Sequence, residues 1–484
     1  MMRTRFSLPR LPAGRGRSLL ALGLAVACLA GCAVGPKFRN PGPAVPAGWQ
    51  SPLPHDGEPA NLVEWWRQLG DPLLTELVAE ADRRNATVEA ALAGVRAARA
   101  NAGLELARLL PAGEGTWEEQ RSRSIIGFTE QGPLTGVART TTRSLDARWE
   151  IDLLGGQRRA LEAAQRRAFA ADSRWHLART TVAAEVANSY TAYRACTARR
   201  ALLQSAVTAR EATATLVARK AQAGLLAKGE AAQAAAAAAD NRAAARAVEA
   251  ACVRARNALA YLTGLDGAEL AKRLTAAAQP ETLPVPVATR VDVLPAVLVR
   301  QRPDVAAAEA EWAAAVADLG FGIGELLPSV NLLGSVGKST TAVLGGSFGV
   351  DNWRFGPTVS MPVLSVASAT AGISSLRAQI AVARARYEDQ VRVAIREVED
   401  ALATLAAADA RDADAAVAAA NWTQALQAIE ARHRAGLAST LELEQVRLAQ
   451  LQAADTRIAL AQERTTAWVA LYKALGGGWS PSEE

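Results

Sequence analysis

Side chains that commonly carry catalysis are sparse in this sequence. The three histidines, His55, His176 and His433, lie far apart, and none has a thiol or a second ligand at metal-binding spacing. Residues 334–340, GSVGKST, end like a phosphate-binding loop, but Leu332 stands where that loop requires its first glycine. We therefore expect no catalytic residues, no metal site and no nucleotide site, so the chain is not expected to be an enzyme.

One cysteine has the surroundings of a covalent attachment site. Cys32 follows an arginine-rich start and an apolar run at 19–30, which is too short to span a bilayer permanently. Residues 29–32, Leu-Ala-Gly-Cys, look like a bacterial lipobox. We expect 1–31 to be a signal peptide and Cys32 to become the first residue, carrying diacylglycerol and palmitate. An ordinary secretory signal with a chance cysteine is the alternative. Ala33, where an aspartate would signal inner-membrane retention, predicts an anchor in outer-membrane lipid.

The formal net charge of +6 does not indicate a nucleic-acid-binding protein. Five arginines fall within the signal segment, which contains no acids, and removing them from +6 leaves +1. The remaining chain has neither a basic face nor interleaved aromatics. We expect no nucleic-acid partner.

The chain contains two copies of one unit. Residues 223–225 recur as 435–437, 212 positions later, and residues 109–111 recur as 326–328, 217 positions later. The register holds on both sides of one five-residue length change, which marks an internal duplication. The expected boundaries are 1–31 for the signal peptide, 32–60 for a lipid-anchored linker, 61–266 for the first repeat, 267–290 for a second linker, 291–478 for the second repeat and 479–484 for a tail.

Each copy should form a long helical hairpin. From Gln157 to Ala223 there is neither glycine nor proline, and these 67 residues would form a helix about 100 Å long at ~1.5 Å per residue. The second copy has an equivalent run, and a shorter clean run follows each. Gly224 and Gly436 separate the runs and are expected to end one helix before the chain doubles back. The expected hairpins are 156–264 and 369–476.

Cys28 lies in the signal segment, so two other cysteines remain to test this folding. Cys196 and Cys252 lie 28 residues before and 28 residues after Gly224, so they are level on opposite arms. An oxidising compartment then favours a disulfide between them, with two small buried thiols as the alternative. The second copy has Ala408 and Arg464 at these positions and would lack the bridge.

The segments where the copies differ in length look like strands. Apolar and other residues alternate over 352–363, and more briefly over 144–151. We expect two strands per copy, within about 112–153 and 328–365. Their apolar and polar faces suit a membrane barrel, or a soluble hairpin with one wet face. Four strands cannot close a membrane barrel and open edges are not tolerated in lipid, so three copies, with twelve strands, are expected to assemble.

Several motifs, in this order, resemble the outer-membrane factor family of TolC-like channels, specifically its NodT-type lipoprotein branch. They are WWRQLGDP at 65–72, WEIDL at 149–153, and RPDV at 302–305 followed by Glu309. Two departures concern the strand ends: Leu154 stands where the family usually has phenylalanine, and 364–368 read LSVAS instead of Leu-Phe-x-Gly-Gly.

The resemblance implies a mainly α protein with membrane β structure and an internally duplicated TolC-like fold. A homotrimer would form a twelve-strand β-barrel continued by a twelve-helix α-barrel in the periplasm. It also implies a passive exit duct in the outer membrane, working with a periplasmic adaptor and an inner-membrane pump.

In that family the hairpin turns form the periplasmic tip, where the adaptor docks. The corresponding residues here are Gly224, Leu225, Leu226, Gly436, Leu437 and Ser439. An acid six residues after each turn glycine helps to close the aperture, which here points to Glu230 and Glu442. The alternative is a pair of helix-start carboxylates stabilised by the helix dipole.

Two other functions share part of this pattern. The outer-membrane component of a type I protein secretion system would use the same duct. A periplasmic adaptor is also a lipid-anchored hairpin protein, but it carries one hairpin between compact β domains, whereas this chain has two hairpins. The lipobox and the NodT-like motifs favour efflux.

Overall fold

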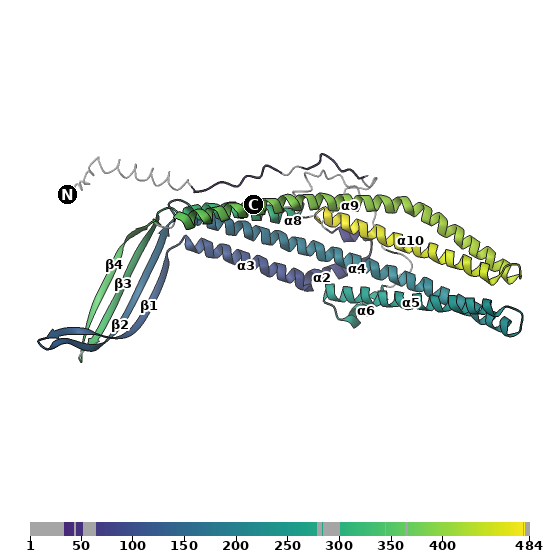
Figure 1. The fold of residues 1–484 in the computed structure, drawn as a ribbon, viewed down its shortest axis with the longest axis horizontal. Coiled ribbons are helices and arrows are strands. Elements are labelled where there is room, and N and C mark those ends of the chain that lie inside the picture. Colours follow the sequence, from purple (N-terminus) through teal and green to yellow (C-terminus); the bar gives the residue numbers. More distant parts are fainter. Residues whose placement is uncertain are drawn as a thin grey trace, which may run out of the picture. The chain divides into compact units, whose positions relative to one another are not determined.

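The computed structural model describes residues 33–42, 45–51, 64–277, 283, 301–343, 345–363, 366–477 and 479. These residues form mostly helices and one four-stranded sheet (Figure 1). The chain divides into two compact units. Unit 1 is drawn from Met1–Pro41, Arg96–Ala170 and Glu309–Arg386, and unit 2 from Gly42–Val95, Ala171–Ala308 and Tyr387–Glu484.

Both repeats contain two strands, a long helix and a shorter return helix, preceded by opening helices. In the first repeat the elements are η1 (Trp65–Leu69), α2 (Pro72–Arg84), α3 (Ala86–Arg108), β1 (Ala112–Thr129), β2 (Gly132–Ile151), α4 (Gly156–Gln222) and α5 (Lys228–Thr263). In the second they are α8 (Pro303–Gly324), β3 (Ser329–Val343), β4 (Gly346–Ser360), α9 (Val366–Arg434) and α10 (Thr440–Ala474). Helices α4 and α9 contain 67 and 69 residues, so each is about 100 Å long at ~1.5 Å per residue.

The segment expected to be a linker, 267–290, opens with a helix instead. Helix α6 spans Gly267–Ala276. The Asp266 side chain caps its first turn, and Leu270 and Leu274, one turn apart, are buried. Two leucines four positions apart are too short a pattern to identify a helix from the sequence, although the cap and the buried contacts stabilise it.

Strand β4 and helix α9 also differ from their expected limits. Strand β4 ends at Ser360 although the alternating pattern continues to Val363, because its partner β3 begins at Ser329, which is opposite Ser360. Helix α9 begins at Val366, three residues before the expected hairpin start, and includes Gly372. One glycine costs a helix interior only about 1 kcal/mol, which so long a helix tolerates.

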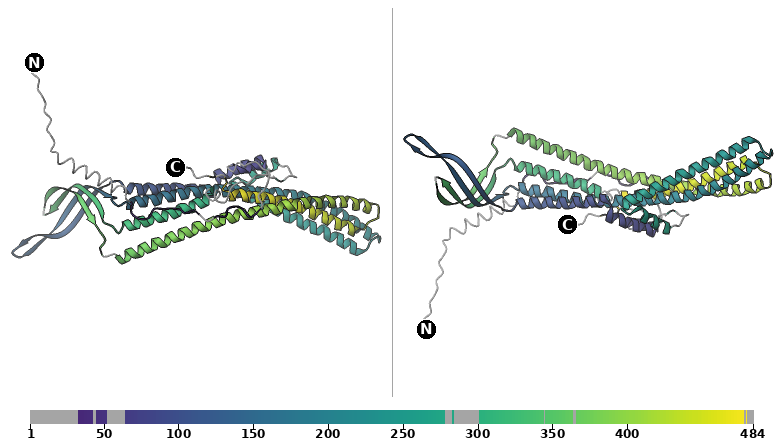
Figure 2. Two further views of the ribbon diagram at one scale, coloured as in Figure 1. Left: turned by 90° about the horizontal axis from the view of Figure 1, so that it is seen from above. Right: turned by 90° about the horizontal axis from the view of Figure 1, so that it is seen from below.

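The four strands form one antiparallel sheet in the order β1-β2-β3-β4. Within each repeat the strands form a hairpin, and the turns hold Gly132 at φ +123° and Gly345 at φ +82°, where side chains are disfavoured. Between the repeats, β2 pairs with β3 from Arg139 opposite Ala342 to Ile151 opposite Val330. In Figure 2 the blue strands of the first repeat and the green strands of the second lie side by side. The two repeats therefore share one sheet.

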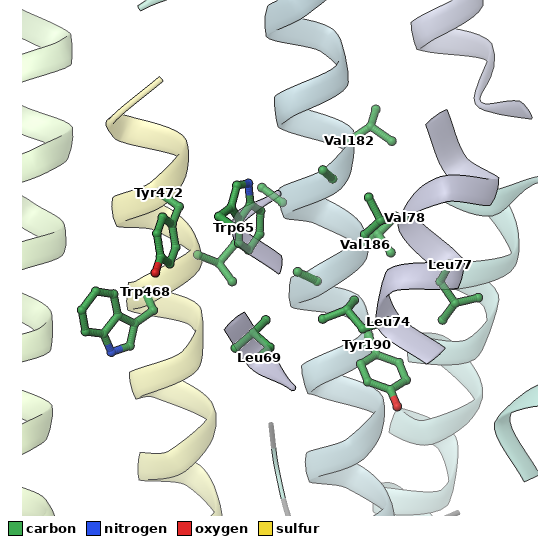
Figure 3. Close-up of a cluster of buried hydrophobic side chains, with 14 of the residues drawn as sticks. Trp65, Leu69, Leu74, Leu77, Val78, Val182, Val186, Tyr190, Trp468 and Tyr472 are labelled. Carbon is green, nitrogen blue, oxygen red and sulfur yellow. The ribbon is translucent and has the colours of Figure 1, made fainter. Parts of the chain in front are cut away.

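The main hydrophobic core lies in unit 2 and draws on both repeats. Trp65 of η1 is 1% exposed and stacks on Tyr472 of α10, with ring centroids 5.4 Å apart. Leu74 of α2, Val186 of α4 and Trp468 of α10 pack into the same cluster (Figure 3). Full burial of an aliphatic side chain contributes roughly 1.5–3 kcal/mol. This cluster therefore fixes the opening helices against both hairpins.

Unit 1 uses small residues where its helices meet. Ala163 of α4 packs against Ala314 and Ala317 of α8, and none of the three is more than 1% exposed. A Cβ added to Gly324 would lie 3.0 Å from the Cα of Gly156. The end of α8 and the start of α4 therefore approach each other as closely as glycine permits.

Candidate channel wall and hairpin tips

One face of the sheet is apolar over the rows toward the end of β2 and the start of β3, whereas the next row on the same face, Arg143, Lys338 and Asp351, is charged. Cross-strand partners share a face, as do residues two apart along a strand, so the register assigns each side chain to a face. Leu145, Val336 and Trp353 are partners in one row and are 60%, 58% and 81% exposed. The same face also carries the exposed side chains of Trp117, Trp149, Phe355 and Val359. A contiguous apolar surface of this kind indicates a membrane or protein neighbour.

The opposite face of the sheet is mainly polar. Asp146, Ser335 and Arg354 form one row on it. Leu333 also lies on this face, as do Phe348 and Val350 near the turn between β3 and β4. Neighbouring hydroxyls are hydrogen-bonded in the pairs Thr116–Ser144, Thr140–Thr341 and Thr142–Ser339. A sheet with one apolar and one polar face fits the wall of a membrane barrel, with lipid on one side and water on the other.

Each helical hairpin turns at a glycine in the left-handed region. Gly224 and Gly436 have φ values of +75° and +77°. The next residue, Leu225 or Leu437, donates its N–H to the carbonyl five positions earlier, at 2.9 and 2.8 Å, which closes a Schellman motif. Leu225 and Leu437 are 73% and 71% exposed. The two turns also contain the other expected tip residues, Leu226 and Ser439.

The two acids after the turns have different surroundings. Each is the third residue of its return helix. The Glu442 carboxylate accepts from the Ser439 N–H at 2.7 Å and from its hydroxyl at 3.1 Å, while the Glu442 N–H donates back to that hydroxyl. These bonds hold the pKa of Glu442 below its ordinary value. Glu230 follows Ala227, which offers no side-chain cap, and its carboxylate has no hydrogen-bond or ion-pair partner among the described residues.

The arms of the two hairpins are joined differently. Cys196 of α4 and Cys252 of α5 form a disulfide, with their Cα atoms 5.4 Å apart, and both are 6% exposed. In the second hairpin Arg464 of α10 pairs with Asp409 of α9 at 2.9 Å, beside Ala408. A covalent bond thus links the arms of the first hairpin at the level where a solvent-accessible ion pair links the second.

A polar network joins the two hairpins, and sequence reasoning missed it. Arg210 of α4 is 7% exposed, pairs with Glu444 of α10 at 3.1 Å and donates to Asn241 of α5 at 3.3 Å. Arg447 of α10 pairs with Glu444 at 3.0 Å and with Glu430 of α9 at 3.1 Å. Sequence spacing offers no signal for the link between α4 and α10, because these helices belong to different repeats.

The tryptophan and Asp-Pro motif of the first repeat has a structural role. One carboxylate oxygen of Asp71 accepts from the first turn of α2. The other accepts from the Tyr190 hydroxyl at 2.7 Å and from Arg194 at 2.9 Å. Burial and the bond to Asp71 raise the pKa of the Tyr190 phenol. Asp71 therefore ties the opening helix to α4.

The Arg-Pro-Asp motif of the second repeat has a parallel role. Arg302 is 4% exposed and pairs with Asp304 at 2.6 Å and with Glu397 of α9 at 2.7 Å. It also donates to the carbonyl of Ala474, at the end of α10, at 2.8 Å. Burial lowers the pKa of Arg302, but the bonds to these carboxylates outweigh burial and raise it. One guanidinium thus connects α8, α9 and α10.

The expected lipid attachment residue, Cys32, lies outside the described residues, but the residues after it are placed. The Val34 N–H donates to the Leu154 carbonyl at 2.9 Å, and Arg159 Nε donates to the Val34 carbonyl at 3.1 Å. Gly35 has φ +90°, and a Cβ there would lie 2.5 Å from the Cα of Gly320. The segment after Cys32 is therefore packed within unit 1, between the end of β2 and the start of α4.

Sites for other chemistry are not evident in the described ranges. His176 and His433 lie on α4 and α9, and His55 falls outside these ranges. No group of three His, Cys, Asp or Glu side chains in the described residues could hold a metal ion. Residues 334–340 belong to strand β3, whereas a phosphate-binding loop leads into a helix. Among the placed helices, none is both long and apolar enough to cross a membrane.

Known proteins are similar to this sequence over nearly its whole length. A profile of the outer membrane efflux protein family matches residues 77–265 and 294–477. The chain is 30% identical to the pyoverdine export outer membrane protein OpmQ of Pseudomonas putida, over 96% of this chain and 98% of that protein. It is 28% identical to the outer membrane protein OprJ of Pseudomonas aeruginosa, over 93% and 94% of the two chains.

Solved structures share the fold. The outer-membrane channel OprN matches with a TM-score of 0.81 and 29% identity, over 93% of this chain and 100% of that chain. The open state of the MtrE outer membrane channel of Neisseria gonorrhoeae matches with a TM-score of 0.76 and 25% identity, over 94% and 100%. The expected TolC-like fold is confirmed, and these relatives are channels. This chain belongs to the outer membrane efflux protein family and is an outer-membrane channel protein.

Proposed function

We propose that three copies of this chain close into the exit duct of a tripartite efflux system and conduct small molecules out of the cell. The amphipathic sheet carries this proposal. Within one chain, β1 and β4 are the two edges of the sheet, and unpaired edges are not tolerated in hydrocarbon. Pairing β4 of one copy with β1 of the next removes every edge, and three copies supply twelve strands. The duct itself has no enzymatic activity, so energy for transport comes from a partner.

The partners in this proposal are a periplasmic adaptor and an inner-membrane pump. The exposed leucines, Leu225 and Leu437, give each tip an apolar contact on a turn fixed by glycine. Such a rigid, exposed side chain suits docking, because little conformational freedom is lost on binding. We infer that Gly224, Leu225, Leu226, Gly436, Leu437 and Ser439 contact the adaptor.

The proposed aperture acids are Glu230 and Glu442, which threefold symmetry would arrange as rings favouring cations. Replacing both by Gln removes the charge while keeping the capping box, because Gln also caps from this position. We expect lower cation selectivity in single-channel recordings of the double variant, whereas Glu249→Gln, a change on α5 distant from the turn, leaves it unaltered. Equal selectivity in both variants would leave the two acids as helix-start carboxylates only.

We also propose that Cys32 carries diacylglycerol and palmitate. The packing of Val34 and Gly35 in unit 1 supports this, because it places residues just after Cys32 beside the end of strand β2. Labelled palmitate should be incorporated by the wild type and lost in Cys32→Ser. Incorporation by the variant would contradict the proposal.

The decisive test of transport is a strain lacking the gene, grown with antibiotics, dyes, bile salts and metal ions, with and without complementation. Hypersensitivity rescued by the wild-type chain is the expected result, and it names the substrate class. Unchanged sensitivity together with a missing secreted protein would instead assign the duct to type I secretion. Cross-linking of the purified protein should give a trimer, and a monomer that conducts would contradict the assembly.

A further inference from the structure

Unit 2 contains a cavity of about 580 Å³, and neither strand residues nor the residues of the hairpin turns line it. It is lined by residues of η1, α2 and α4 and by residues that follow α10. Three indole side chains face it: Trp65, Trp66 and Trp479. Its volume lies within the usual range of small-ligand sites, which are mostly apolar with a few convergent polar groups.

Two of these rings are partly open to solvent and held in place by other aromatic rings. Trp66 meets the buried Trp65 edge to face, with centroids 5.7 Å apart. Trp479 packs against His176 of α4, with centroids 6.1 Å apart. Burial lowers the pKa of His176, which favours the neutral imidazole. The cavity therefore offers the aromatic surfaces of Trp66 and Trp479, both fixed by neighbouring rings, beside the neutral imidazole of His176.

The charged groups that line the cavity are already paired with each other. Asp82 accepts two hydrogen bonds from Arg179, at 2.6 and 2.9 Å, and Glu64 pairs with Arg67 at 3.0 Å. The side chains of Asp82 and Arg179 are 38% and 40% exposed, so further lone pairs and N–H groups remain reachable. These opposite charges cancel, which favours a neutral ligand with many hydroxyl groups over an ion.

One buried donor of the lining has no partner. Trp65 is 1% exposed, and its Nε1–H has no acceptor in the described chain. In Figure 3 this nitrogen lies on the edge of the ring that faces away from Leu69. A buried N–H without an acceptor is costly, but protein atoms cover this nitrogen, so a ligand in the cavity reaches it only if the lining moves.

We propose that this cavity binds a glycan chain. A pyranose ring has apolar C–H faces that stack on indole rings and a rim of hydroxyls that bond to carboxylate, guanidinium and indole N–H groups, which is the combination found here. Trp66 and Trp479 supply the stacking surfaces, and Asp82 and Arg179 the polar contacts. For a protein whose helices lie in the periplasm, a placement that rests on the proposed function, the glycan within reach is the cell-wall polymer. Binding it would fasten the channel to the wall.

The test uses the full-length purified protein and two probes. The first is co-sedimentation with isolated cell-wall sacculi, and the second is titration with a tetramer of N-acetylglucosamine, followed by tryptophan fluorescence. Trp479→Ala removes a stacking surface outside the helices, and we expect its affinity for both probes to fall about tenfold or more. Trp422→Ala is the matched control: this residue of α9 is 40% exposed and lies outside the cavity lining, so its affinity should match that of the wild type.

Three outcomes would overturn the inference. They are no binding of either probe by the wild type, equal affinity of the wild type and Trp479→Ala, and binding of an apolar dye in this cavity without binding of the sugar. Asp82→Asn gives a second check, because it keeps the shape of the side chain while breaking the ion pair, and it should also weaken sugar binding. Rescue of drug sensitivity by Trp479→Ala is scored separately, so loss of glycan binding and loss of transport are distinguishable.

Discussion

Removing the disulfide of the first hairpin should loosen that hairpin selectively. Cys196 and Cys252 are 56 positions apart, and closing a loop of this length contributes about 4 kcal/mol in the chain-entropy treatment, which is an upper estimate. At about 1.4 kcal/mol per tenfold, the bridge suppresses opening of the arms by up to roughly a thousandfold. We therefore replace both cysteines by alanine. The equilibrium constant for local separation of α4 from α5, between the bridge and the tip, should rise by at least about tenfold.

The assay is hydrogen exchange of the assembled protein, compared between peptides from 200–250 and peptides from 412–460. The second hairpin is the internal reference, because its Asp409–Arg464 pair is partly exposed and such pairs contribute only about 0–1 kcal/mol. In the wild type the first hairpin should exchange more slowly than the second, and in the double variant the two should become similar. Unchanged exchange of the first hairpin in the double variant would refute the reasoning.

Three further predictions concern other parts of the chain. Arg302→Ala removes a buried guanidinium whose partners, Asp304 and Glu397, are 12% and 38% exposed, and should destabilise the chain by less than the about 3–5 kcal/mol of a fully buried pair, measured as a lower denaturation midpoint. Trp353→Asp puts a charge on the apolar part of the sheet and should reduce membrane assembly, at a cost below the about 2–4 kcal/mol of Arg or Lys at the bilayer midplane. Asn352→Asp, on the polar face, should assemble normally in the same gel-shift assay. The bonds from Ser439 lower the pKa of Glu442, so this cap is present above the ordinary glutamate pKa and is lost as the pH falls through the lowered pKa. Amide exchange at the start of α10 should rise over that acidic range in the wild type and be high throughout in Ser439→Ala.

The sequence predicts much of the fold because the duplication repeats each signal. Gly224 and Gly436 mark the two turns, and the absence of glycine and proline between Gln157 and Ala223 indicates α4 almost residue by residue. The alternation around Trp353 identifies both faces of a strand. These patterns depend only on residues close together in the sequence, so they can be recognised before any tertiary contact is known.

Contacts between the repeats could not be predicted in the same way. The pairing of Arg210 with Glu444 joins residues of different repeats. In the sequence, each of these charged residues is typical of a solvent-exposed position on a helix. The cavity around Trp65, Trp66 and Trp479 depends equally on distant segments, because η1, α4 and the end of the chain converge on it. The Trp-Trp motif identified the family but gave no indication that one indole N–H would be buried without a partner.

The pairing of β2 with β3 has a consequence for how the channel could have arisen and how it assembles. These strands belong to different repeats and pair over thirteen positions, so the two halves of the chain meet as separate subunits would. In a closed ring of three such chains, half of the repeat-to-repeat seams are intramolecular. Because two repeats belong to one chain, each has a high effective concentration for the other. Only three chains, rather than six separate repeats, must then meet to complete the ring. Two repeats in one chain also need not be identical: a disulfide links the arms of the first hairpin, and an ion pair links those of the second.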